Sequence, residues 1–370
     1  MPKLFKPKAI DLFCGAGGLS LGLEKAGFEI TLAVDNDVRS LETYQRNLGH
    51  KTLHGDLTRL KPKNVRRELG LGQIDLIAGG PPCQGFSIQR RGSDVDERND
   101  LLLRFLDWVV EIQPRYFLIE NVSGLRGRRG RPYLERLIQR ARQAGYVCQY
   151  ELLNAADYGI PQIRKRMVIV GERTASPKPS FQFPQPTHTI GNYRTVRDAI
   201  ADLPHPPEDG SEHSAWPNHR ADRLSPKNRE RFKFVPEGGG RADIPAKYRL
   251  KCHSVDPDKA GHRYVYGRLA WNKPASTITA RFDSLTRGRF GHPSQTRSIS
   301  LREGARLQSF PDTHVFVGTK VEVTRQIGNA VPPQLAFVLG KGILCALRNR
   351  EDLPIRSAAL QQREKRMAVI

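Results

Sequence analysis

The chain has 370 residues, 38% hydrophobic and 26% charged, a composition typical of a globular protein long enough for two lobes. Lys and Arg number 60 against 38 Asp and Glu, so the net charge of +22 favours a nucleic-acid partner over a merely solvated basic surface. The five cysteines form no C-x-x-C pair and no cluster at zinc spacing, which argues against disulfides and a structural metal. A signal peptide and an apolar run near the ~20 residues of a membrane span are also missing. We therefore expect a soluble, cytoplasmic monomer that binds no metal and no membrane.

Short apolar runs alternate with amphipathic stretches up to residue 172. The pattern predicts strands at 8–13, 30–35, 74–80, 115–122 and 164–172, a short one before Asp56, and helices at 19–27, 38–48, 101–113 and 131–145. Strands that alternate with helices predict an α/β fold with a doubly wound, mostly parallel sheet.

Prolines, glycines and histidines become dense from residue 173 to 298, and long periodic segments vanish. Aromatic residues run through this stretch, which favours a smaller, loop-rich domain over a disordered linker. Helical periodicity returns at 300–310 and 334–350.

A glycine loop, "DLFCGAGGLS", follows the first strand and opens a helix, as in nucleotide-binding turns. A dinucleotide fingerprint would need a third glycine, but Ser20 stands there. Asp35 ends the second strand and suits a ribose, and Asp56 can accept a hydrogen bond from an adenine amino group. The loop therefore favours S-adenosylmethionine over NAD, with a purely structural tight turn as the alternative.

Cys83 stands in "GGPPCQGFS", just beyond the carboxyl end of a predicted strand, where open α/β sheets bind ligands. Pro81 and Pro82 fix the backbone before it, which suits a nucleophilic thiolate better than an inert buried thiol. Glu120 ends the next predicted strand and, when partly desolvated, can act as a proton donor. Arg164 and Arg166 alternate near a later strand, so they share one face and can clamp an anion or carbonyl, or else are solvated charges.

Six segments stand in the order typical of the DNA (cytosine-5) methyltransferases: "DLFCGAGG", "GGPPCQGFS", "ENV", "QIRKR", "REGARLQSFP" and "QIGNAVPP". The chain resembles this family, in its bacterial restriction–modification form, over about 1–171 and 298–345. The resemblance implies a Rossmann-like class I methyltransferase fold. It also implies a discontinuous catalytic and cofactor-binding domain at 1–172 and 299–350, a target-recognition domain at 173–298 and a tail at 351–370.

The resemblance assigns the cytosine chemistry to four side chains. Cys83 would add to C6 of the base, and Glu120 would protonate or hydrogen-bond N3. Arg164 would bind O2, while Arg166 would support the site. The implied S-adenosylmethionine site comprises Phe13 against the adenine, the loop of Gly15, Gly17 and Gly18 at the methionine moiety, Asp35 at the ribose, Asp56 and Leu57 at the adenine, and Pro81, Leu101 and Asn329 along the pocket.

The implied partner is double-stranded DNA, with a cognate restriction endonuclease acting on the same site. A base within a duplex must flip out to reach Cys83, and Gln84 and Ser87 could fill the space it leaves. Arg281, Arg287 and Arg289 are the candidate guanine readers. Methylation of RNA cytosine and a catalytically dead DNA-binding regulator remain as alternatives.

Overall fold

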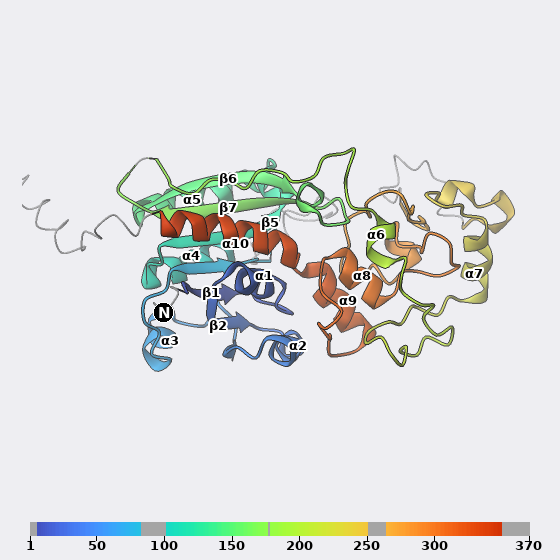
Figure 1. Cartoon of the computed structure of the whole chain (residues 1–370), viewed down its shortest axis with the longest axis horizontal. Helices are drawn as coiled ribbons and strands as arrows, with labels where there is room; N and C mark the ends of the chain where they lie inside the picture. Colours follow the sequence, from blue (N-terminus) through green and yellow to red (C-terminus); the bar gives the residue numbers. More distant parts are fainter. Residues whose placement is uncertain (1–5, 83–100, 177, 251–263, 350–370) are drawn as a thin grey trace, which may run out of the picture.

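The computed structural model describes residues 6–82, 101–176, 178–250 and 264–349, which form two lobes (Figure 1). Cys83, Gln84 and Ser87 lie outside these ranges. The first lobe contains a seven-stranded sheet in the order β3-β2-β1-β4-β5-β7-β6. Its strands are β1 (Lys8–Leu12), β2 (Glu29–Asp35), β3 (Thr52–His54), β4 (Leu76–Gly79), β5 (Tyr116–Val122), β6 (Tyr146–Asn154) and β7 (Lys165–Arg173).

Strands β1 to β5 pair in parallel, and β7 runs antiparallel to both of its neighbours. The predicted α/β class with a mostly parallel, doubly wound sheet is therefore confirmed. The chain builds outward from β1 to β3 and then crosses to β4 on the other side of β1, which creates a switch point between β1 and β4. Ligands of such sheets bind beside the carboxyl ends of the strands at this point.

Alternating side chains give the sheet two buried faces. Ala9 belongs to a core that includes α1 (Gly18–Ala26) and α10 (Pro333–Arg348). The next residue, Ile10, belongs to a core with α3 (Pro62–Glu68), α4 (Leu101–Ile112) and α5 (Arg131–Gln143). Helix α2 (Val38–Leu48) adjoins α1, because Tyr44 donates a hydrogen bond of 2.8 Å to Ser20.

Helix α10 crosses from the second lobe to lie along α1 (Figure 1). The two helices approach so closely that a Cβ on Gly22 would stand 2.4 Å from the Cβ of Ala336. Within the described residues, one stretch, Lys320–Arg348, which includes α10 and the short helix before it, is long and apolar enough to span a membrane. However, 61% of its most apolar window is buried inside the protein, so that apolar surface serves the core.

The second lobe contains the short helices α6 (Val196–Ile200), α7 (Pro226–Lys233), α8 (Leu301–Leu307) and α9 (Lys320–Asn329), joined by long loops (Figure 1). Its main core joins Ile278 and Phe282 to Leu307 and Ile327. This core contains residues on both sides of the domain boundary predicted between 298 and 299, and it also includes Ala16 of the first lobe. Residues after α8 already contact the first lobe, since Asn47 of α2 donates a hydrogen bond of 2.9 Å to the Val315 carbonyl and Thr43 donates one of 2.7 Å to Gln326 of α9. Helix α10 then lies along α1.

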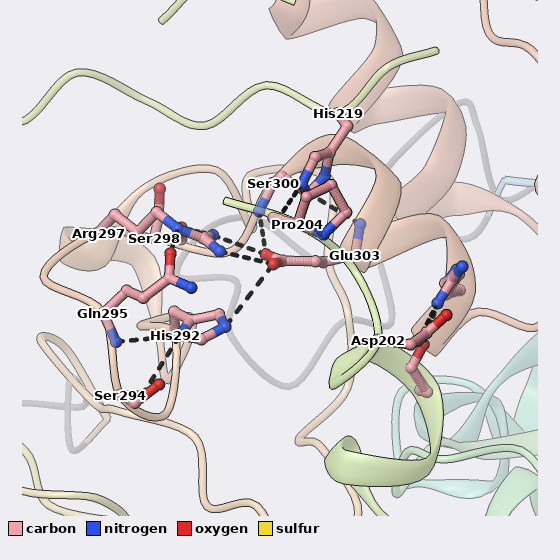
Figure 2. Close-up of polar contacts among 12 residues, drawn as sticks. Asp202, Pro204, His219, His292, Ser294, Gln295, Arg297, Ser298, Ser300 and Glu303 are labelled. Atoms are coloured by element: carbon pink, nitrogen blue, oxygen red, sulfur yellow. Dashed lines mark hydrogen bonds and ion pairs between the residues drawn. The ribbon is translucent and has the colours of Figure 1, made fainter. Parts of the chain in front are cut away.

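A buried carboxylate organises the start of α8 (Figure 2). Arg297 donates two hydrogen bonds of 2.7 Å to the two oxygens of Glu303. The Ser300 amide donates another at 2.6 Å, while the Ser300 hydroxyl caps the helix by accepting from the Glu303 amide. Burial opposes the charge, but Arg297 outweighs it and lowers the pKa of Glu303 to about 2.

Two neutral histidines adjoin this carboxylate (Figure 2). The Nδ1 atom of His292 accepts from the amides of Ser294 and Gln295, which leaves the proton on Nε2, 3.7 Å from Glu303. Burial lowers the pKa of His292 to about 3. His219 lies between the Ser300 hydroxyl and the Pro204 carbonyl, and burial lowers its pKa as well.

The substitution Glu303→Gln should destabilise the protein by about 3 kcal/mol, because it leaves the Arg297 cation without its charge partner. The matched control is Glu322→Gln, which alters the same capping position on α9 at a half-buried site and should have a much smaller effect. The urea dependence of unfolding measures both. Equal effects of the two substitutions would contradict an organising role for Glu303.

Acid should also destabilise the protein. A histidine in the unfolded chain takes up a proton near its ordinary pKa of 6.5, whereas folded His292 does so only near 3. The unfolded state therefore binds more protons in this interval, and stability falls as the pH drops from 6.5 towards 3. Glu303 adds a loss in the same direction between 4.5 and about 2. The urea midpoint measured between pH 7.5 and 5 should decline less steeply in His292→Gln than in wild type.

Candidate active site

A cavity of about 450 Å³ opens at the switch point of the sheet, a size that suits a small-molecule ligand. Its walls come from the loops after β1, β2 and β4 and from the end of α9. The residues that line it are Phe13, Cys14, Gly15, Ala16, Leu19, Asp35, Asn36, Asp37, Ser40, Gly80, Pro82, Arg325, Gln326, Asn329, Ala330 and Val331. Four predicted cofactor residues, Phe13, Gly15, Asp35 and Asn329, are therefore brought together.

The carboxylate of Asp35 holds the glycine loop in shape. Its two oxygens accept hydrogen bonds of 2.8 Å from the amides of Gly15 and Asp37. Burial raises the pKa of Asp35, although these hydrogen bonds oppose that rise. The loop itself turns through positive φ values at Phe13 (62°) and Gly15 (51°), of which the one at Phe13 is unusual for a residue with a side chain. The β1 loop is thus fixed against the end of β2.

Ser20, which breaks the dinucleotide pattern, has a structural role under this loop. Its hydroxyl donates a 2.6 Å hydrogen bond to buried Asp11 and accepts one from Tyr44, whose hydroxyl also lies 3.0 Å from Nδ1 of His50. Burial raises the pKa of Asp11 to about 7. A chain of polar groups therefore connects the base of the cavity loop with the surface of α2.

Glu120 and Arg166 form an ion pair of 2.8 Å between β5 and β7, and both side chains are largely buried. Val122 lies opposite Arg166 in the sheet, so Glu120 and Arg166 are diagonal neighbours on one face. The adjacent Asn121 donates a hydrogen bond of 3.1 Å to the Pro81 carbonyl. The predicted acid, one predicted arginine and the backbone that leads to Cys83 therefore lie together at the carboxyl ends of β4 and β5.

Residues 7–345 match the family of C-5 cytosine-specific DNA methylases. The chain belongs to this family. It is therefore a DNA cytosine-5 methyltransferase, which confirms the resemblance seen in its motifs, and enzymes of this family use S-adenosylmethionine.

Two similar proteins are bacterial. The type II methyltransferase M1.HphI of Haemophilus parahaemolyticus is 37% identical over 340 residues, which cover 90% of this chain and 86% of that protein. The type II methyltransferase M.XorII of Xanthomonas oryzae is 36% identical over 385 residues, which cover 96% of this chain and 88% of that protein.

Solved structures show the same fold. A protein described as a DNA modification methyltransferase encoded within an E. coli prophage superposes with a TM-score of 0.68 at 29% identity, over 93% of this chain and all of that one. Dnmt2 of S. pombe, at 19% identity, superposes with a TM-score of 0.61 over 95% of this chain and all of its own.

Arg164 of this methylase does not point at an open site. Its side chain is buried, and its guanidinium donates hydrogen bonds to three carbonyls: Ile278 at 2.9 Å, and Gly328 and Ala330 at 3.0 Å each. Burial lowers the pKa of Arg164 well below its usual value. The geometry thus differs from the predicted contact with a cytosine oxygen, because the donors of Arg164 are directed at backbone that joins the two lobes.

Several predicted cofactor residues do not line the cavity. A Cβ on Gly18 would meet the Val331 carbonyl at 2.4 Å, so this glycine allows the chain beyond α9 to pack on α1. Leu57 is buried in the core of the sheet, and Pro81 is buried beside Asn121. Gly17, with φ of 90°, precedes α1, and Leu101 begins α4.

Asp56 shapes its own turn. Its carboxylate accepts a hydrogen bond of 2.8 Å from the Thr58 amide, which lowers the pKa of Asp56. The side chain therefore stays charged, and it does not line the cavity.

Apart from Asn329, the cavity residues of α9 were not predicted from the sequence. Arg325 and Gln326 line the cavity, and Arg325 donates a 3.0 Å hydrogen bond to Asp37, another missed lining residue. One signal was present: Thr319 and Glu322 form a reciprocal capping box, a sequence pattern that marks a helix start.

The three candidate guanine readers differ in availability. Arg281 is exposed and lies 3.5 Å from Asp283, and Arg287 is exposed at the end of a short 3-10 turn. Arg289 instead donates hydrogen bonds to the carbonyls of Gly238, Gly239 and Arg268 at 2.5 to 3.0 Å. Arg289 therefore supports the loop fold, and Arg287 presents the more available guanidinium.

The two arginines near Glu120 should respond differently to lysine. Arg164→Lys should destabilise the protein by about 3 kcal/mol, because one ammonium cannot satisfy three separated carbonyls. Arg166→Lys should preserve the fold while reducing methyl transfer. Lysine can pair with Glu120, but it lacks the additional N–H donors of a guanidinium group. Urea unfolding and DNA methylation measure the two effects. A stable but inactive Arg164→Lys variant would instead indicate a direct contact with the reacting base.

Proposed function

We propose that this enzyme transfers a methyl group from S-adenosylmethionine to C5 of a flipped cytosine at a specific sequence in double-stranded DNA. We further propose that it is the modification enzyme of a type II restriction–modification system, because its relatives at 36–37% identity carry type II names. The observation that carries the proposal is the convergence of the switch-point cavity and the Glu120–Arg166 pair beside the backbone that leads to Cys83.

The cavity residues suit an adenosine-containing cofactor. Phe13 offers an aromatic surface, while the carboxylate of Asp35 and the amide of Asn36 suit ribose hydroxyls. Asn329 closes the cavity from α9. Asp37 and Arg325 add one negative and one positive charge, which match an amino acid moiety. When bound, S-adenosylmethionine supplies an electrophilic methyl group on a sulfonium.

The protein must activate the cytosine, because C5 is a weak nucleophile. The Cys83 thiolate adds to C6, and the ring electrons then make C5 nucleophilic. Glu120 holds a proton at N3, which limits negative charge on the ring. Once C5 has gained the methyl group, loss of the C5 proton to a base or water allows the Cys83–C6 bond to break by elimination, which releases the thiolate.

We assign the contact with O2 of the base to Arg166 and give Arg164 a positioning role. Arg166 already lies beside Glu120, so one guanidinium can orient the acid and face the base. Arg164 comes from the first lobe, and its three carbonyl partners lie in the second lobe and in the connection from α9 to α10, so its loss would shift the second lobe relative to the cavity. The second lobe would read the DNA sequence, with Arg287 as the first residue to test.

A DNA duplex containing 5-fluorocytosine tests the proposed mechanism. Fluorine cannot leave C5 as a proton does, so methyl transfer should leave a Cys83–DNA adduct that resists denaturation. Cys83→Ser should form no adduct, and omission of S-adenosylmethionine should abolish the stable complex. Methylation of normal DNA without any adduct on the fluorinated duplex would refute the mechanism. A parallel reaction with unmodified tRNA distinguishes DNA from RNA as substrate.

A further inference from the structure

The loop between β5 and α5 presents a rigid group of arginines. It begins with a short 3-10 helix, Ser123–Arg126, and turns through backbone hydrogen bonds from Gly127 to the Gly124 carbonyl and from Gly130 to the Gly127 carbonyl. Leu125 is fully buried in the core of the sheet. A Cβ on Gly130 would lie 2.4 Å from the Cα of Leu125, so the loop folds tightly on its own anchor.

This fold directs the arginines outward. Arg126, Arg128 and Arg129 are all exposed, whereas Leu125 and Gly130 on either side are buried. A short, anchored loop loses little conformational entropy when its side chains bind a partner.

The charges of this loop differ from those of the neighbouring helix. On α5, Arg131 pairs with Glu135 at 2.8 Å and Arg140 with Asp107 at 2.5 Å, as expected of a solvated surface. Within the described parts of the chain, Arg126 and Arg128 form no such ion pair. These two guanidinium groups are therefore available to an external anion.

The loop also lies at the carboxyl end of β5, beside the Glu120–Arg166 pair. It starts directly after Val122, the strand residue opposite Arg166, and Glu120 lies two residues further back. When a base of the DNA contacts Glu120, the phosphates next to that base must lie close to this end of β5. A pair of guanidinium groups on an anchored backbone matches a phosphodiester backbone, both in charge and in donor geometry.

We propose that Arg126 and Arg128 bind the phosphodiester backbone of the DNA substrate next to the flipped nucleotide. This inference rests on the proposed function and extends it to a surface outside the target-recognition lobe. The contact positions the duplex and is independent of base sequence, since phosphate contacts carry no sequence information directly.

The test compares two double variants of the full-length enzyme. Arg126→Gln/Arg128→Gln removes both charges from the loop. Arg67→Gln/Arg142→Gln removes two exposed arginines, one from α3, at the end of the first lobe away from the second (Figure 1), and one from the last turn of α5. Binding to a fluorescent 30-base-pair duplex of arbitrary sequence is measured by anisotropy over a KCl series, and methylation is measured on unmethylated plasmid DNA.

The loop variant should bind the duplex roughly 10-fold more weakly, and its slope of log affinity against log salt should be smaller by about two. Its KM for plasmid DNA should rise, while kcat at saturating DNA and the affinity for S-adenosylmethionine stay at wild-type values. The control variant should keep the wild-type slope. Equal slopes for the loop variant and wild type, or equal losses in both variants, would overturn the proposal.

The binding measurement does not depend on chemistry. If wild type forms no 5-fluorocytosine adduct but the loop variant still loses two units of salt slope, the proposed mechanism fails and the DNA surface stands. If wild type forms the adduct and the salt slope does not change, the DNA surface is wrong and the mechanism stands.

Discussion

Buried arginines that donate to backbone carbonyls hold together the parts of this enzyme that lack regular structure. Arg164, Arg268 and Arg302 each serve three or four carbonyls, with Arg268 binding those of Phe232, Val235, His292 and Gln295 at 2.6 to 3.1 Å. A buried carbonyl without a hydrogen-bond partner lowers the stability of the fold by about 1–3 kcal/mol. Long loops contain many carbonyls that no helix or sheet hydrogen bond satisfies. One guanidinium, with its five donors, can satisfy several of them at once. The loop-rich lobe thus obtains from arginine side chains the hydrogen bonds that a sheet provides in the first lobe.

Arg164 extends the same interaction across the interface between the lobes. It joins Ile278 in the second lobe to Gly328 and Ala330, which flank the cavity residue Asn329. Its neighbour Arg166, two residues along β7, faces Glu120 instead. Two arginines at the start of β7 therefore have different roles: Arg164, just before the strand, fixes the backbone around the site, and Arg166, within the strand, contacts the acid.

The sequence predicts the first lobe well, since amphipathic helices and apolar strands leave periodic patterns. It predicts Phe13, Gly15, Asp35 and Asn329 near one ligand because strand ends and family motifs mark them. Strand β6 (Tyr146–Asn154) is not predicted from the sequence, because this edge strand is half exposed and has mixed polarity. The structural use of Arg164 escapes for a different reason: its carbonyl partners lie 114 to 166 residues away, and carbonyls leave no trace in a sequence pattern.

The return of the chain along α10 makes the second lobe an insertion in the first, attached after β7 and before α10. Its core joins Ile278 and Phe282 to α8 and α9, so these helices pack against the loops that precede them. A transplant of DNA specificity between relatives should therefore exchange the whole segment from the end of β7 to the start of α10. A graft that stops near residue 298 would divide one hydrophobic core between two parents, and each half would lack the side chains that shaped it.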